Sequence, residues 1–139
     1  YLSKISGPLL DRIDIHIEVT PVPFEKLSDD QKAESSVDIR KRVTAAREIQ
    51  TERFEQMEHI HYNAQMNTKH IREYCALDDV SKQLLKTAME RLNLSARAYD
   101  RILKVARTIA DLDAAPIVVS SHIAEAIQYR SLDRDGWLG

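Results

Sequence analysis

Glycine, cysteine and aromatic residues are scarce in this sequence of 139 residues. With 3 glycines and 4 prolines, the chain is expected to form long helices with short connections. A single cysteine, Cys75, excludes an intramolecular disulfide. No apolar run is long enough to span a bilayer and no signal-peptide pattern opens the chain, so we expect no membrane partner.

Several catalytic motifs are also missing. A P-loop requires the pattern G-x-x-x-x-G-K-[ST], whose backbone amides hold phosphates, and Gly7, Gly136 and Gly139 do not fit it. The patterns G-x-S-x-G and H-E-x-x-H do not occur either, and one cysteine cannot form a paired-cysteine motif. The chain by itself is therefore not expected to be a complete enzyme of these types.

The charge is nearly balanced. The formal net charge is −2, which gives no global attraction to nucleic acid or to acidic membranes. Any site for an anion must therefore be local. The length and the hydrophobic content of 43% are sufficient for one domain with a modest core.

Residues 13–19 (IDIHIEV) alternate strictly between apolar and polar side chains, and most of the apolar ones are β-branched. This pattern predicts a β-strand, which Pro21 and Pro23 end. A lone strand has nothing to pair with, so we expect its sheet partners upstream of Tyr1 in a longer protein. The chain is accordingly interpreted as a piece of that protein.

A polar, irregular stretch over residues 22–36 predicts a boundary, and helices follow it. Ser35, Asp78 or Asp79, and Ser95 stand where N-capping side chains are expected. The predicted helices span residues 36–57, 68–75, 79–92, 96–111 and 120–129. The organisation is thus one strand, a linker and a bundle of about five helices.

Arg97 stands out because it lies in the first turn of the helix that Ser95 caps. A cation there faces the positive end of the helix dipole at a cost of roughly 0.3–1 kcal/mol. An arginine beside free helix-start amides forms an anion site, which phosphate commonly occupies. Arg101 and Lys104 share this face, although they also fit a solvated face opposite an apolar stripe. That stripe is predicted to contain Tyr99, Ile102, Leu103, Ala106, Ile109 and Ala110.

Arg12 follows a Gly7-Pro8 turn and precedes the predicted strand. An arginine at the rim of a sheet is able to point at a neighbouring subunit. The alternative is a local salt bridge with Asp11 or Asp14.

The histidines and the cysteine are residue types that bind metals, but their spacing fits no metal-binding pattern. His59 and His61 have a spacing that does not share a helix face, and neither His70 nor Cys75 completes a zinc pattern. We therefore expect no metal ligands, and Cys75 is interpreted as a small buried hydrophobe.

Two segments carry a family resemblance. Residues 6–16 (SGPLLDRIDIH) resemble the end of the ATPase core in magnesium-chelatase-like AAA+ proteins of the YifB/ComM type. Residues 94–112 (LSARAYDRILKVARTIADL) resemble the C-terminal lid helix of the same family. Residues 63–66 and 125–130 are similar to it as well, so the resemblance covers nearly the whole chain.

The resemblance implies a mainly α fold: a helical lid bundle preceded by one β-strand left over from an α/β ATPase core. Residues 1–22 would end the core, residues 23–35 would be a linker, residues 36–131 the lid and residues 132–139 a tail. Arg12 resembles an arginine finger that reaches the ATP of an adjacent subunit.

In the same family Arg97 resembles the second sensor, which contacts the γ-phosphate, and Arg101 would be a weaker contact. ATP and magnesium would be bound mainly by the upstream core. The partners implied are that core and adjacent subunits of a ring, expected to be a hexamer, with DNA as the substrate of the whole protein. The implied location is the bacterial cytoplasm.

Two other interpretations remain open. One is a stand-alone helical DNA-binding module that uses Arg97, Arg101, Lys104 and Arg107. The other is an interaction scaffold without any nucleotide role. The net charge of −2 disfavours the first of these.

Overall fold

The structure is a computed structural model that describes residues 4–28, 30 and 32–130. Within these ranges it is helical, and no residue of them lies in a β-strand. The elements in chain order are α1 (Gly7–Asp11), α2 (Phe24–Leu27), α3 (Ser36–Arg53), the 3-10 helix η2 (Asn63–Gln65), α4 (Thr68–Tyr74), α5 (Asp79–Arg91), α6 (Ala96–Leu112) and α7 (Ser120–Gln128). The predicted mainly α fold is confirmed.

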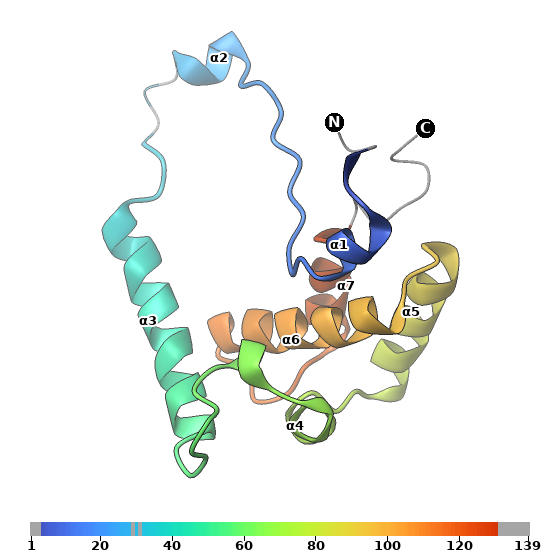
Figure 1. Ribbon diagram of the computed structural model, residues 1–139. Helices are drawn as coiled ribbons and strands as arrows, with labels where there is room; N and C mark the ends of the chain where they lie inside the picture. Colours follow the sequence, from blue (N-terminus) through green and yellow to red (C-terminus); the bar gives the residue numbers. More distant parts are fainter. Residues whose placement is uncertain (1–3, 29, 31, 131–139) are drawn as a thin grey trace.

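Helix α6 is the centre of the bundle. It packs against α7, α3, α4 and η2, and α5 in turn packs on α7. Figure 1 shows α3 standing at one side of this arrangement, while α1 lies above α6 beside α7. The segment between α1 and α3 arcs away from the bundle and carries the short helix α2. The region predicted as a linker therefore contains one helical turn, none of whose residues is buried.

The long helices begin where their capping residues predicted. Ser35 Oγ accepts from Asp38 N–H, Asp78 Oδ1 accepts from Ser81 N–H, and Ser95 Oγ accepts from Ala98 N–H. Each bond satisfies a donor that the first helical turn leaves free. No helix among the described residues has the length and apolar character that crossing a bilayer requires.

Residues 13–19 form no strand in the described part of the chain. Their apolar side chains remain largely in solvent, with Ile17 66% and Val19 88% exposed. The prediction of a strand is wrong for this chain in isolation because a strand requires a neighbour to receive its backbone hydrogen bonds. None of the described segments supplies such a neighbour.

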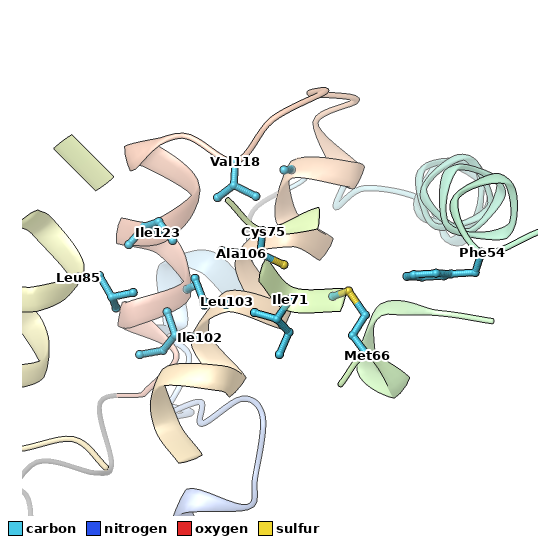
Figure 2. Close-up of a cluster of buried hydrophobic side chains, with 12 residues drawn as sticks. Phe54, Met66, Ile71, Cys75, Leu85, Ile102, Leu103, Ala106, Val118 and Ile123 are labelled. Carbon is cyan, nitrogen blue, oxygen red and sulfur yellow. The ribbon is translucent and has the colours of Figure 1, made fainter. Parts of the chain in front are cut away.

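The hydrophobic core surrounds the inner face of α6 (Figure 2). Ala98, Ile102, Ala106 and Ala110 are fully buried along this helix, and their spacing follows its turns. Tyr99 was predicted on this face but is 41% exposed. The buried cluster also includes Phe54, Met66, Ile71, Cys75, Leu85, Leu103, Val118, Ile123 and Ala126.

Helix α3 ends at Arg53, earlier than the predicted end near residue 57. Phe54, directly after it, is only 2% exposed, and its ring meets that of Tyr74 edge-on with centroids 5.6 Å apart. The end of the helix at this point places Phe54 in the core and Arg53 beside α6.

Candidate functional site around the first half of helix α6

Arg97 lies in the first turn of α6 and is exposed. Its side chain makes no hydrogen bond or ion pair with any residue that the structure describes. Helix α6 has no acidic residue in its first turn, whereas α3 has Asp38 and α5 has Asp79 there. The positive end of α6 and the guanidinium of Arg97 therefore face solvent together, which favours an anionic ligand.

Arg12 is the C-cap residue of α1 and is also exposed. Its Nη1 donates to the carbonyl oxygen of Pro8 at 3.4 Å, a long hydrogen bond. The predicted alternative for Arg12 was a salt bridge with Asp11 or Asp14, and neither forms between these described residues. The charge of Arg12 is thus available to a partner outside the described chain.

Arg101, in contrast, is paired. Its Nη1 lies 2.7 Å from Asp14 Oδ1, and the two side chains are 31% and 47% exposed. This ion pair joins the segment that follows α1 to the first half of α6. It brings the neighbourhoods of Arg12 and Arg97 together, because Asp14 lies close to Arg12 in the chain and Arg101 lies one helical turn from Arg97.

The remaining basic residues of α6, Lys104 and Arg107, are bound by other parts of the bundle. Lys104 Nζ donates to the carbonyl oxygen of Ala64 at 3.1 Å, and Arg107 is only 3% exposed. The predicted row Arg97, Arg101, Lys104 and Arg107 therefore does not form an exposed basic face. This finding removes the main support for a DNA-binding module based on α6.

Arg107 belongs to a buried polar cluster around Asp111, whose side chain has no solvent exposure. Arg53 binds Asp111 through two hydrogen bonds of 2.8 and 2.6 Å, and Arg107 Nη2 lies 3.1 Å from Asp111 Oδ1. Asn63 Nδ2 donates to Asp111 Oδ2 at 2.8 Å. The cluster connects α3, η2 and α6, and we call it the Asp111 cluster.

The other donors of Arg107 reach backbone oxygens. They bind the carbonyl oxygens of Tyr74, Pro116 and Ala115 at 3.4, 3.2 and 2.7 Å. The end of α6 makes this possible. Ala114 adopts a left-handed φ of 52°, and Ala115 N–H donates back to Ala110 O at 2.8 Å. This is a Schellman turn, which directs the following carbonyls back toward the helix.

The Asp111 cluster was not predicted from the sequence. One signal was present: Asp111 lies in the last turn of α6, where the helix dipole disfavours an acid, and Arg107 stands at i−4 on the same face. An acid in that position, beside the apolar stripe, indicates a buried pair. Its partner Arg53 comes from a distant segment and carries no local signal.

The histidines are dispersed. His59 and His61 are exposed, His70 completes the cap of α4, and His122 Nε2 lies 3.1 Å from Asp113 Oδ2. Since Val119 N–H donates to Nδ1 of His122 at 3.0 Å, the ring proton must be on Nε2 and points at Asp113. No group of three or more His, Cys, Asp and Glu among the described residues is arranged to hold a metal ion.

Burial raises the pKa of the Cys75 thiol to about 11, although the nearby charge of Arg107 acts in the opposite direction. The thiol is therefore a buried apolar group rather than a reactive one. At the exposed end of α5, the backbone N–H of Ser81 lowers the pKa of Asp78 because it stabilises the carboxylate.

The family of the chain follows from comparison with known sequences. The family described as magnesium chelatase, subunit ChlI C-terminal, matches residues 33–130. The chain belongs to this family. The preceding residues 1–27 match the family described as magnesium chelatase, subunit ChlI.

Similar curated proteins place the chain among the ComM and YifB relatives of the magnesium chelatase family. Competence protein ComM of Haemophilus influenzae is 43% identical over 135 residues, which is 96% of this chain and 26% of ComM. YifB of Escherichia coli is 41% identical over the same share. An uncharacterized protein of Mycobacterium tuberculosis is 32% identical over 130 residues. The chain thus spans about a quarter of the length of these relatives.

Proposed function

We propose that the chain is the lid and sensor portion of a magnesium-chelatase-like AAA+ ATPase and couples the nucleotide state of a ring to remodelling of DNA. Residues 1–22 would complete the ATPase core, residues 23–35 would connect it to the lid, residues 36–131 would form the lid and residues 132–139 a tail; residues 1–3, 29, 31 and 131–139 of these ranges lie outside the described residues. The observation that carries this proposal is Arg97, an exposed arginine at the start of the central helix of a family member, whose side chain has no partner among the described residues.

In this proposal Arg97 is the second sensor. Its guanidinium and the amides at the start of α6 would bind the γ-phosphate of ATP, because both belong to the first turn of the helix and carry positive charge. Attachment of α6 to the bundle would then transmit the contact, since α6 packs against α3, α4, η2 and α7. A nucleotide that engages Arg97 would thereby set the position of the whole lid.

Arg12 would be the arginine finger. A cation near the transferred phosphoryl group stabilises the charge that spreads over its oxygens in the transition state. Arg12 is exposed and unneutralised by Asp11 or Asp14, as a residue that acts on an adjacent subunit must be. The exposed apolar side chains of Ile17 and Val19 support the assignment of this segment to a sheet that the upstream core would provide.

ATP and magnesium would be held mainly by that upstream core, which would supply the P-loop. We therefore expect negligible ATP hydrolysis from the chain alone. A homo-oligomeric ring, a hexamer in our proposal, and DNA as substrate rest on the family resemblance, as does a cytoplasmic location.

A subunit-mixing ATPase assay on the full-length protein tests the proposal. One partner carries Arg12→Ala and the other lacks the P-loop lysine of the core, so each is expected to be inactive alone. In mixed rings some interfaces pair an intact P-loop with an intact Arg12, and ATPase activity should reappear there.

The control is Arg40→Ala, which removes an exposed arginine from α3 and should leave activity unchanged. If Arg12→Ala alone is nearly fully active, then Arg12 does not act on the nucleotide and the finger assignment fails. If Arg97→Ala is fully active as well, the scaffold interpretation replaces the ATPase lid.

A further inference from the structure

The turn that carries Arg12 is fastened to the end of α7 by a buried arginine. Arg130 has no solvent exposure, and its guanidinium donates to the carbonyl oxygens of Ile13 and Leu10, the latter at 3.1 Å. Beside it, His16 N–H donates to the carbonyl oxygen of Tyr129 at 2.7 Å. Arg130 thus holds the backbone on both sides of Arg12 at a fixed point of the bundle.

A second contact holds the same turn from the side of α6. Asp14 and Arg101 form the 2.7 Å ion pair described above, and both side chains remain partly in solvent. This is the one side-chain ion pair between the turn that carries Arg12 and α6 among the residues that the structure describes. It joins the two segments that carry the arginines of the proposed nucleotide machinery.

The two attachments differ in how easily they can be altered. Removing Arg130 would take away a donor from the carbonyl oxygens of Ile13 and Leu10 at a position without solvent exposure, which costs folding stability. Asp14 and Arg101 are exposed enough that their pair adds little to stability, as is usual for surface ion pairs. Their contact therefore fits a role in orientation better than a role in holding the fold.

We propose that Arg101 is a positioning residue: through Asp14 it fixes the turn that carries Arg12 relative to α6 and Arg97. Within one subunit, Arg97 would sense the nucleotide and Arg12 would reach the adjacent subunit. The ion pair then fixes the position of one arginine relative to the other. This inference rests on the proposed function and gives Arg101 a partner in the protein rather than in the nucleotide.

Charge reversal in the full-length ATPase tests the proposal. Asp14→Arg and Arg101→Asp should each lower kcat by about 10-fold, because a small displacement of a catalytic cation is costly. The KM for ATP should stay within about 2-fold, since neither side chain binds the nucleotide. The double variant, Asp14→Arg with Arg101→Asp, restores an ion pair of opposite direction and should recover most of the lost kcat.

The chain offers a matched control. Glu34 and Arg42 form a surface ion pair of 2.8 Å with side chains 45% and 59% exposed, away from both arginine sites. Charge reversal of either or both of these residues should leave kcat and KM unchanged. The midpoint temperature of thermal unfolding should be nearly the same for every variant. A loss of kcat then results from misplacement of Arg12 and not from loss of the fold.

Three results would overturn the inference. A rise in KM from Arg101→Asp but not from Asp14→Arg would mean that Arg101 binds the nucleotide directly. Failure of the double variant to recover kcat, while Arg12→Ala is inactive, would mean that the ion pair does not position Arg12. Single charge reversals that keep full kcat, while Arg12→Ala is inactive, would lead to the same conclusion. The proposed function fails in a different way, because then Arg12→Ala and Arg97→Ala both retain activity.

Discussion

Arg97 and Arg107 belong to the same helix, α6, and differ in almost everything else. Arg97 is exposed and has no partner among the described residues, whereas the Arg107 side chain is 4% exposed and binds Asp111 and several backbone oxygens. Sequence spacing alone had placed both in one basic row. The difference teaches that the available partners, rather than the residue type or the helical face, separate an arginine that holds the fold from one that is free to bind a ligand.

The largest expected effect concerns the Asp111 cluster. Asp111→Ala should lower the free energy of unfolding by about 3–5 kcal/mol, because it leaves Arg53 and Arg107 with uncompensated charges in the interior. Urea unfolding followed by far-UV circular dichroism measures the change. Asp100→Ala, on the same helix but with a side chain that binds none of the described residues, should cost no more than about 0.5 kcal/mol. If Asp111→Ala and Asp100→Ala lowered the free energy of unfolding equally, the buried second half of α6 would contribute no more to stability than its first half.

Cys75 reports on the same buried region through its pKa. The thiol ionises near pH 9 in the unfolded chain but only near pH 11 in the folded one, so above pH 9 the folded state retains a proton that the unfolded state loses. The contribution of the thiol to the free energy of unfolding is therefore fully present below pH 9. It falls by about 2–3 kcal/mol as the pH rises from 9 to 11. The difference in urea midpoint between the native sequence and Cys75→Ala, followed against pH, isolates this group. A pH-independent difference would contradict the burial of the thiol.

A smaller effect is expected at the turn that directs carbonyl oxygens toward Arg107. Ala114 has a left-handed φ of 52°, which disfavours a residue with a Cβ. Ala114→Gly should raise the free energy of unfolding by up to about 1 kcal/mol, since relief of this strain exceeds the added entropy of the unfolded chain. Ala124→Gly, within α7, is the matched control and should lower stability by a similar amount. A loss of stability from Ala114→Gly would show that the turn is not strained.

The helices were predictable because their signals are local. Ser35, Asp78 and Ser95 mark the helix starts, and each makes the expected capping bond. The strand over residues 13–19 was not correctly predicted for the chain alone. Alternation shows which face of a strand would be buried, but pairing depends on a neighbour that residue spacing cannot supply.

In the candidate site, too, the features with a local sequence signal were predictable and the contacts between distant segments were not. Arg97 was predictable because a cation in the first turn of a helix opposes the local dipole, a feature visible within a few residues. The pairing of Arg101 with Asp14 and of Arg53 with Asp111 was not, because each pair joins segments far apart in the chain. The family resemblance implied roles for Arg12 and Arg97, but their surroundings came only from the fold.

The smallest effect on stability, and the sharpest test of the comparison, is expected for Arg97→Ala. Removing a cation from the positive end of α6 should change the free energy of unfolding by less than about 0.5 kcal/mol, with a slight gain. Yet kcat/KM for ATP in the full-length protein should fall by at least about 10-fold, because the proposed contact with the phosphate would be lost. In contrast to Arg97→Ala, Arg107→Ala should lower the free energy of unfolding by several kcal/mol. If Arg97→Ala destabilised the protein by more than about 1 kcal/mol, Arg97 would be a structural residue like Arg107, and its availability for a nucleotide would no longer follow from its exposure.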